Sequence, residues 1–159
     1  MNTDRLPQSL RRLLAVFHVD FRPVGRPSTS GLLFAIVVAI VGSLLADYLL
    51  VRLGVKVFPS TRGFVHFQFS DYAKLTIIGV VIACIGWPIV AKVSSRPRWL
   101  FALAAVVVTL VLFLPDLWIW HQGSPAKAVF VLMWMHVAIA LVTYYSLVLL
   151  APVRRPRRH

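Results

Sequence analysis

The sequence contains no glutamate, and its only acidic residues are five aspartates among 159 residues. Lysine and arginine together number 17, which gives the chain a formal net charge of +12. In a soluble protein such a charge would point to a nucleic-acid partner. Here the basic residues flank long apolar segments, so we expect them to meet anionic lipid headgroups and predict no nucleic-acid partner.

Cysteine is almost absent as well. Cys84 is the only one, so an internal disulfide and a dithiol redox pair are both excluded. Only one histidine lies deep in an apolar segment, whereas a haem held between helices needs two axial ligands. A zinc site needs three or four convergent ligands, for which the signal is weak. We therefore predict no cofactor and no metal.

Apolar residues are what the chain has in abundance. It is 59% hydrophobic, and its mean hydropathy is +0.81. Each of four apolar segments is long enough to cross about 30 Å of hydrocarbon as a helix: 31–51, 72–93, 99–120 and 126–150. The sequence predicts an all-α integral membrane protein, in which residues 31–151 form a four-transmembrane-helix up-down bundle. Basic tails, residues 1–30 and 152–159, flank this bundle.

Lysines and arginines are unevenly divided between the two sides of the predicted spans. Twelve lie in the two tails and in the connection between the second and third spans, and five lie on the other side. Positive charge favours the cytoplasmic side. We therefore predict a multi-pass protein of the plasma (inner) membrane with both termini in the cytoplasm.

The two tails are predicted to contact the cytoplasmic leaflet. Leucines and phenylalanines recur at helical spacing from Leu6 to Phe21, which indicates an amphipathic surface helix. The alternative is a basic leader without fixed structure. We predict contacts with anionic headgroups for Arg11, Arg12, Arg154, Arg155, Arg157 and Arg158.

The connection between the first two spans is the longest. Its segment Phe64–Phe69 alternates in a way that predicts an extended strand. Such an aromatic segment either rests at the membrane interface or forms a lid over an outward-facing pocket. We expect Ser70 or Asp71 to cap the second span, and Asp71 to pair with Lys74.

Rows of small residues predict the faces along which the first two spans pack. These rows are Ala35, Ala39, Gly42 and Ala46 in the first span, and Thr76, Gly79, Ala83 and Gly86 in the second.

Three ionisable residues lie within the predicted spans: Asp47, Asp116 and His136. Such groups are costly in a membrane and usually face the bundle interior or a water-filled cavity. The two aspartates lie roughly 6 Å, and His136 roughly 15 Å, below the outer ends of their spans. This pattern predicts an outward-opening pocket that binds a ligand or relays protons.

A structural explanation of the same three residues stays open. Both aspartates can reach headgroup water if Pro115 ends the third helix and leaves Asp116 in a loop. In this explanation His136 has a purely structural role, a hydrogen bond that joins two helices.

Four further residues are weaker candidates for the same site: Ser43, His66, Asp71 and His121. Ser43 lies roughly 12 Å below the outer end of its span, near the depth of His136, so a serine–histidine dyad is geometrically allowed. No oxyanion motif accompanies the pair, and helix packing explains Ser43 equally well.

Several stretches carry a resemblance to a known family. They are DYAKLTIIGVVIACIGWP from Asp71, LPD at Leu114–Asp116, PAKAV at Pro125–Val129 and MHVAIALVTY at Met135–Tyr144. On these residues the segment 71–152 resembles an uncharacterised family of small four-span membrane proteins of high-GC bacteria. The family pattern ends with Met-His in the last span, which Met135-His136 matches. The resemblance implies the fold and the membrane, and it implies no activity.

No motif names a reaction. Our leading hypothesis is a non-enzymatic protein that binds a lipid-like ligand or a membrane protein partner, with a second copy of the chain included, through its outer half. The alternative is a small membrane enzyme or proton-coupled carrier that uses Asp116 and His136.

Overall fold

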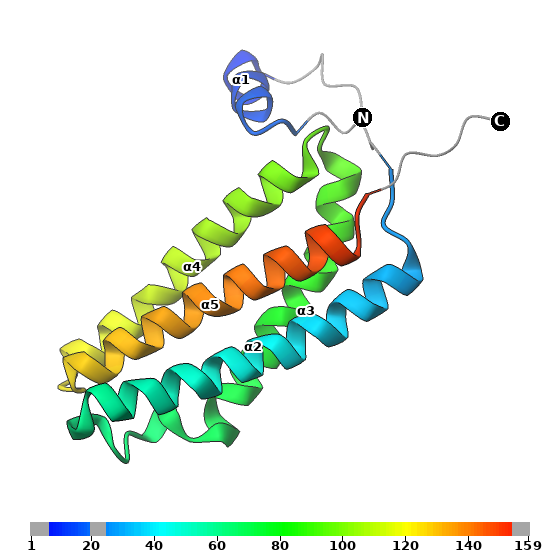
Figure 1. Ribbon diagram of the computed structural model, residues 1–159. Coiled ribbons are helices and arrows are strands. Elements are labelled where there is room, and N and C mark those ends of the chain that lie inside the picture. Colours follow the sequence, from blue (N-terminus) through cyan, green and yellow to red (C-terminus); the bar gives the residue numbers. More distant parts are fainter. Residues whose placement is uncertain (1–6, 20–24, 154–159) are drawn as a thin grey trace.

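The computed structural model describes residues 7–19 and 25–153, apart from the side chains of Leu10, Arg11 and Leu13. Within these ranges the chain forms one short and four long helices and no strand (Figure 1). The helices are α1 (Gln8–Val16), α2 (Thr29–Val57), α3 (Phe69–Val93), α4 (Pro97–His121) and α5 (Ala126–Leu150). Two short 3₁₀ turns, η2 (Pro59–Thr61) and η3 (Val65–Phe67), connect α2 to α3.

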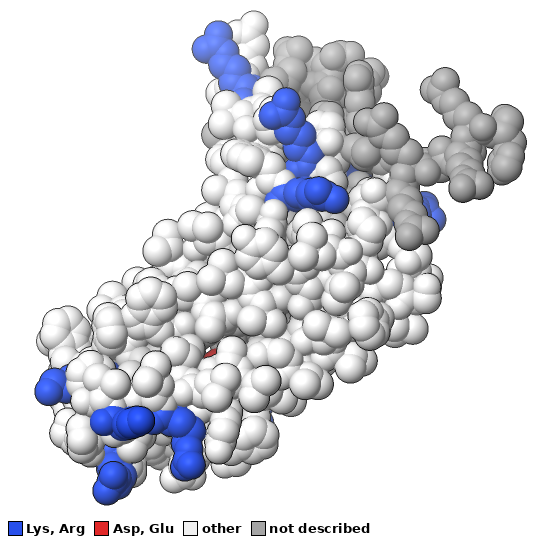
Figure 2. Space-filling view, viewed as in Figure 1, with Lys and Arg blue, Asp and Glu red and all other residues white. Residues whose placement is uncertain are grey.

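Helices α2 to α5 are each long and apolar enough to cross a membrane. A helix satisfies its backbone hydrogen bonds internally, which a membrane span requires. Figure 2 shows a band over these helices in which no lysine or arginine and only a small acidic spot is visible, with lysine and arginine gathered at both ends of the molecule. The prediction of an all-α bundle with four membrane-spanning helices is therefore confirmed.

The bundle has two distinct ends, which we name by what lies there. At the terminal end, α2 begins, α5 ends and α3 turns into α4 (Figure 1). At the loop end lie η2, η3 and the connection between α4 and α5. Sequence neighbours among the four helices therefore run antiparallel.

Helices α2 and α5 approach closely because glycines of α2 face α5. A Cβ atom on Gly31 would lie 2.7 Å from the carbonyl oxygen of Leu150. A Cβ atom on Gly54 would lie 2.7 Å from Cγ2 of Val131, near the other end of the pair. Only a residue without a side chain allows this separation of the two backbones.

The packing face of α3 differs from the predicted row of small residues. Thr76 is buried, but a Cβ atom on Gly79 or Gly86 would have no neighbour within 4 Å among the described residues. Larger side chains form the buried face instead, with Val80 and Trp87 at its centre. The row failed as a predictor because Gly79 and Gly86 lie off the buried face of α3, on which Val80, Cys84 and Trp87 follow Thr76 at helical spacing.

Two apolar clusters fill the bundle. The terminal core consists of Ala35, Ala39, Val80, Cys84, Trp87, Phe101, Leu147, Val148 and Ala151. The loop core consists of Val51, Tyr72, Ala73, Val131, Leu132 and Met135. Phe58, Phe64 and Phe67 from the α2–α3 connection pack against the loop core. The connection thus covers the loop end of the bundle with aromatic rings.

The extended strand predicted for Phe64–Phe69 is wrong. The segment turns through η3, where Phe67 N donates to Phe64 O over 3.0 Å, and α3 already begins at Phe69. An isolated strand here would leave backbone groups unpaired, whereas a 3₁₀ turn pairs them locally. Ser70 and Asp71 consequently lie inside the first turn of α3, and Gln68 takes the N-cap position without a side-chain bond.

The short helix α1 is held against the terminal end. Ser94 Oγ donates to the carbonyl oxygen of His18 over 2.8 Å, and Val19 forms a β-bridge with Ser94. The ring of His18 meets Trp99 edge-on at 5.5 Å between centroids. Contacts from just beyond α1 therefore tie it to the α3–α4 connection.

Helix α2 is longer than the predicted first span, whereas α4 has about the length predicted for the third. Helix α2 continues past the predicted end of the first span to Val57, which places Asp47 about 15 Å from its loop end. Helix α4 continues through Pro115 to His121, so Asp116 lies in a helix and is 5% exposed. A proline inside a helix costs one backbone bond but does not end a helix held by its neighbours.

Candidate functional site

A buried polar cluster brings together residues from all four long helices. Its members are Asp47 of α2, Thr76 of α3, Asp116 of α4 and His136 of α5. Asp47 is fully buried, and its Oδ2 accepts a hydrogen bond from Thr76 Oγ1 over 2.6 Å. This short bond joins α2 to α3 in the interior of the bundle.

Asp116 and His136 form the other half of the polar cluster and join α4 to α5. His136 Nδ1 lies 3.1 Å from Asp116 Oδ2 and 3.0 Å from the carbonyl oxygen of Leu132. A carbonyl oxygen only accepts hydrogen bonds, so Nδ1 carries a proton and donates it to Leu132. Asp116 Oδ2 is close to the imidazole, yet it makes no hydrogen bond among the described residues.

The two halves of the polar cluster interact electrostatically. His136 lies close enough to Asp47 for the charges of the two side chains to act on each other. Asp47 keeps one oxygen, Oδ1, without a hydrogen-bond partner in the described part of the chain. Buried carboxylate oxygens without partners are costly, so the polar cluster is not explained by stability.

Two buried hydroxyl groups on the same faces of α2 and α5 likewise lack hydrogen-bond partners among the described residues. They belong to Ser43, one turn from Asp47, and Thr143, two turns from His136. Ser43 therefore makes no hydrogen bond to His136 in this structure. The serine–histidine dyad that the sequence allows is not assembled.

The remaining weak candidates lie at the surface of the loop end. Asp71 Oδ2 and His66 Nδ1 are 2.7 Å apart, and both side chains are about half exposed. Among the described residues Asp71 thus pairs with His66, not with Lys74 as the sequence predicted. His121 is the exposed last residue of α4, and its ring lies 6.4 Å from that of Trp118.

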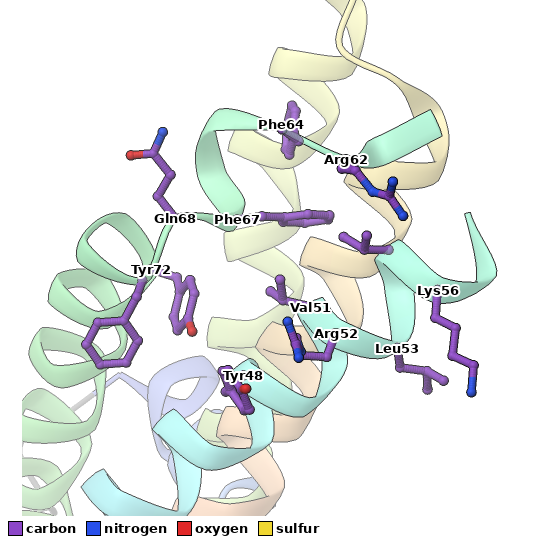
Figure 3. Close-up of a pocket in the computed structure, with 13 residues that line it drawn as sticks. Tyr48, Val51, Arg52, Leu53, Lys56, Arg62, Phe64, Phe67, Gln68 and Tyr72 are labelled. Atoms are coloured by element: carbon purple, nitrogen blue, oxygen red, sulfur yellow. The ribbon is translucent and has the colours of Figure 1, made fainter. Parts of the chain in front are cut away.

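An open groove of about 950 Å³ lies at the loop end between α2, η3 and the start of α3 (Figure 3). Tyr48 and Arg52 line it from α2, and Phe67 and Tyr72 face them from the other side. The complete lining is Tyr48, Val51, Arg52, Leu53, Val55, Lys56, Arg62, Gly63, Phe64, Phe67, Gln68, Phe69 and Tyr72.

The charge of this groove has one sign. Arg52, Lys56 and Arg62 are exposed, and none of the described residues that line the groove is acidic. The guanidinium of Arg52 lies 5.7 Å from the centre of the Tyr48 ring, a cation–π contact that orients it. The groove therefore combines three cations with an aromatic and aliphatic wall.

The groove and the polar cluster are separate features. Tyr72 lines the groove, whereas Thr76, one turn further along α3, bonds to Asp47 behind it. The loop core lies over the polar cluster at the loop end. The residues that line the groove do not include Asp47, Asp116 or His136. Within residues 7–19 and 25–153, no three histidine, cysteine or acidic side chains converge as a metal site would require.

Sequence reasoning missed several residues of these two features. Thr76 appeared only as a packing residue, although its depth in the second span resembles that of Asp47 in the first. Arg52, Lys56 and Arg62 appeared only as a charge count, because nothing in the sequence brings them to one groove. Of the tail arginines, Arg12 is exposed, the Arg11 side chain is not described, and Arg154, Arg155, Arg157 and Arg158 lie outside the described residues.

Comparison with known proteins gives one match. Residues 19–152 match the model of the family of unknown function DUF6069, well beyond the segment whose motifs suggested an uncharacterised family. No curated protein and no solved structure matches the chain. The chain therefore belongs to the DUF6069 family, whose function is unknown.

Proposed function

We propose that this protein binds an anionic phospholipid in the groove at its loop end, and that this end faces outward from the plasma membrane. The observation that carries the proposal is the groove of about 950 Å³ with three cations on an aromatic wall. Such a groove matches a molecule with a negative headgroup and apolar chains. The activity is binding and not a reaction.

The headgroup is assigned to the three cations. Arg52, Lys56 and Arg62 lie in the last turns of α2 and just after η2, where a membrane span reaches the headgroup layer. A guanidinium forms paired hydrogen bonds with phosphate oxygens, and Arg52 is already oriented by Tyr48. Each basic residue near an anionic headgroup contributes about 1 kcal/mol.

The acyl chains are assigned to the apolar wall. Tyr72 and Val51 form the buried floor of the groove, and Phe64 and Phe67 cover its upper side with rings 5.2 Å apart. Leu53 and Phe69 are more than half exposed at its edge. These edge residues open the groove sideways toward the membrane, which is the path that a lipid chain requires.

A lipid fits this site better than a membrane protein partner. The wall is concave, and its three cations would remain unpaired against an apolar helix, which is unfavourable in a membrane. A partner that neutralised them would need three acids at the same depth. A phospholipid brings a phosphate and its chains together.

The test compares binding of fluorescent phosphatidylglycerol with that of fluorescent phosphatidylcholine to the full chain in detergent. The intact protein is expected to prefer phosphatidylglycerol. A variant with Arg52→Gln, Lys56→Gln and Arg62→Gln should lose most of this preference, since each lost charge weakens binding by about fivefold.

The matched control is Lys74→Gln with Lys127→Gln, which removes charge from the same end but not from the groove. This control should bind like the intact protein. Equal binding of both lipids by the intact chain, or equal loss in the groove variant and the control, would overturn the assignment. Cross-linking of the groove residues to another protein would instead support a partner.

The proposed orientation has its own test. Both termini are assigned to the cytoplasm, where Arg12, Arg26, Lys92, Arg96 and Arg98 of the terminal end and the tail arginines meet anionic headgroups. A reporter that is active only in the cytoplasm should work when fused after His159. Activity of a periplasmic reporter at that position would reverse the orientation.

A further inference from the structure

The lipid groove leaves the polar cluster unused, and the polar cluster has features of a binding site of its own. Asp47 is 0% and Asp116 is 5% exposed, and each keeps a carboxylate oxygen without a hydrogen-bond partner among the described residues. The side chains come from four different helices. A stabilising contact between two helices does not need this many ionisable groups.

All three ionisable groups lie at related depths in the membrane. Counted from the loop end of their helices, Asp47 and His136 are each about 15 Å deep and Asp116 is about 8 Å deep. His136 contacts Asp116 directly at 3.1 Å and acts electrostatically on Asp47. The three groups therefore respond to one another when any of them gains or loses a proton.

The surroundings supply no other charge to balance the polar cluster. Every lysine and arginine side chain that the structure describes is exposed. The polar cluster is faced by Thr76 and Tyr72 from α3, and of these two only Tyr72 has a titratable group. The Tyr72 hydroxyl is within electrostatic reach of Asp47 and of Tyr48, both on α2. Charge balance must therefore come from protons on Asp47, Asp116 and His136 themselves.

Counting protons gives the states of the polar cluster. With both carboxyls ionised and the imidazole neutral, the net charge is −2. One bound proton, on the imidazole, makes the net charge −1. A second bound proton makes the polar cluster neutral. A low-dielectric interior disfavours net charge, so the neutral form is the stable one in the membrane.

The hydrogen bonding of His136 leaves one site open for the first of these two protons. Its Nδ1 proton is committed to the carbonyl oxygen of Leu132, and this fixes the tautomer. The lone pair of the neutral ring is then on Nε2, and the side chain is 23% exposed. His136 is thus the member of the polar cluster that can exchange a proton with its surroundings.

We propose that Asp47, Asp116 and His136 form one proton-binding site, which takes up two protons, one on the His136 ring and one on a carboxyl group, and so alternates between a form of net charge −2 and a neutral form. Thr76 positions Asp47 by donating to its Oδ2. The site and the lipid groove share no side chain, so either proposal can fail without the other.

Infrared difference spectroscopy of the full chain in lipid nanodiscs tests the proposal. As pH rises, the intact protein should lose a carbonyl-stretch band of a buried protonated carboxylic acid. Asp47→Asn and Asp116→Asn should each shift or remove that band. The matched control Asp71→Asn removes an exposed acid at the same end and should leave the band unchanged.

A second measurement uses the unchanged protein, so it tests the proposal even if the aspartate variants unfold. Met135–His136 is the only Met–His pair in the sequence, so carbonyl-¹³C methionine with uniformly ¹³C,¹⁵N-labelled histidine singles out His136, and transfer through its labelled carbons reaches its ring, in nuclear magnetic resonance spectra. The ring should be protonated on Nδ1 alone at high pH and on both nitrogens at low pH, changing together with the carboxyl band.

Two results would overturn the proposal. One is a ring of His136 and a carboxyl band that both stay constant over the pH range in which the protein is folded. The other is a change that occurs in sodium buffer and disappears when choline replaces sodium, because the ligand would then be a metal cation.

Discussion

The terminal and loop halves of the bundle bury their side chains by different means. In the terminal half, Trp87 is fully buried in an apolar core, and its Nε1–H donates to the carbonyl oxygen of Ala151 over 2.9 Å. In the loop half, Asp47 and Asp116 are about as buried, yet each keeps an oxygen without a partner among the described residues. The terminal half therefore satisfies the polar atom of Trp87, and the loop half carries the groove and the polar cluster for which we propose binding.

The strongest test of this difference is removal of Trp87. Trp87→Ala should lower the free energy of unfolding by about 3 to 5 kcal/mol, because it leaves a cavity beside Phe101 and removes a buried hydrogen bond. Thermal unfolding in detergent measures the loss. Trp118→Ala, at a side chain 63% exposed, is the control and should change stability by about 0.5 kcal/mol or less. Equal losses in the two variants would remove the distinction between core and surface tryptophans.

A pair of changes in the loop half should have opposite effects. Thr76→Val leaves Asp47 without its donor and should destabilise the fold by about 1 to 3 kcal/mol. Replacing both residues in an Asp47→Leu, Thr76→Val variant should restore stability or raise it, since a buried polar pair is often replaced by apolar groups at no cost. Chemical unfolding of both variants decides this. A double variant less stable than Thr76→Val would show that the polar cluster contributes to stability after all.

The smallest expected effect concerns two glycines in different surroundings. Gly54→Ala places a methyl group 2.7 Å from Val131 and should cost about 1 kcal/mol. Gly79→Ala meets no described atom within 4 Å, so stability should stay the same or rise by up to about 1 kcal/mol. Unfolding midpoints of the two variants give the comparison. A loss at Gly79 equal to that at Gly54 would indicate that the exposed face of α3 contacts another molecule.

The four spans were predictable because bilayer thickness imposes a length and an apolar composition that can be read from residues alone. The interior position of Asp116 and His136 was also predicted, because ionisable groups within a span usually face the bundle interior, and their contact at 3.1 Å agrees with it. Both inferences depend on properties of a single helix. No knowledge of neighbouring helices was needed.

The features that the sequence did not predict depend on how neighbouring helices pack against one another. Gly79 and Thr76 lie one turn apart in α3, yet one faces outward and the other bonds to Asp47, because the rotation of α3 is set by what it packs against. The turn at η3 and the extra length of α2 arise likewise from the covering of the loop core. The groove cations come together only after these elements are placed.

The length of α2 also has a consequence for the bilayer around the protein. Its 29 residues measure about 43 Å, whereas an average hydrocarbon layer is about 30 Å thick. The apolar part of α2, residues 31–51, measures about 31 Å and matches this layer, so the excess turns, which carry Arg52 and Lys56, extend into the headgroup layer. Arg52 and Lys56 in the last turns of α2 act as anchors that fix the vertical position of the bundle. The thickness of the host membrane therefore sets how far headgroup water lies from Asp47, and sorting into a thinner membrane would bring that water closer.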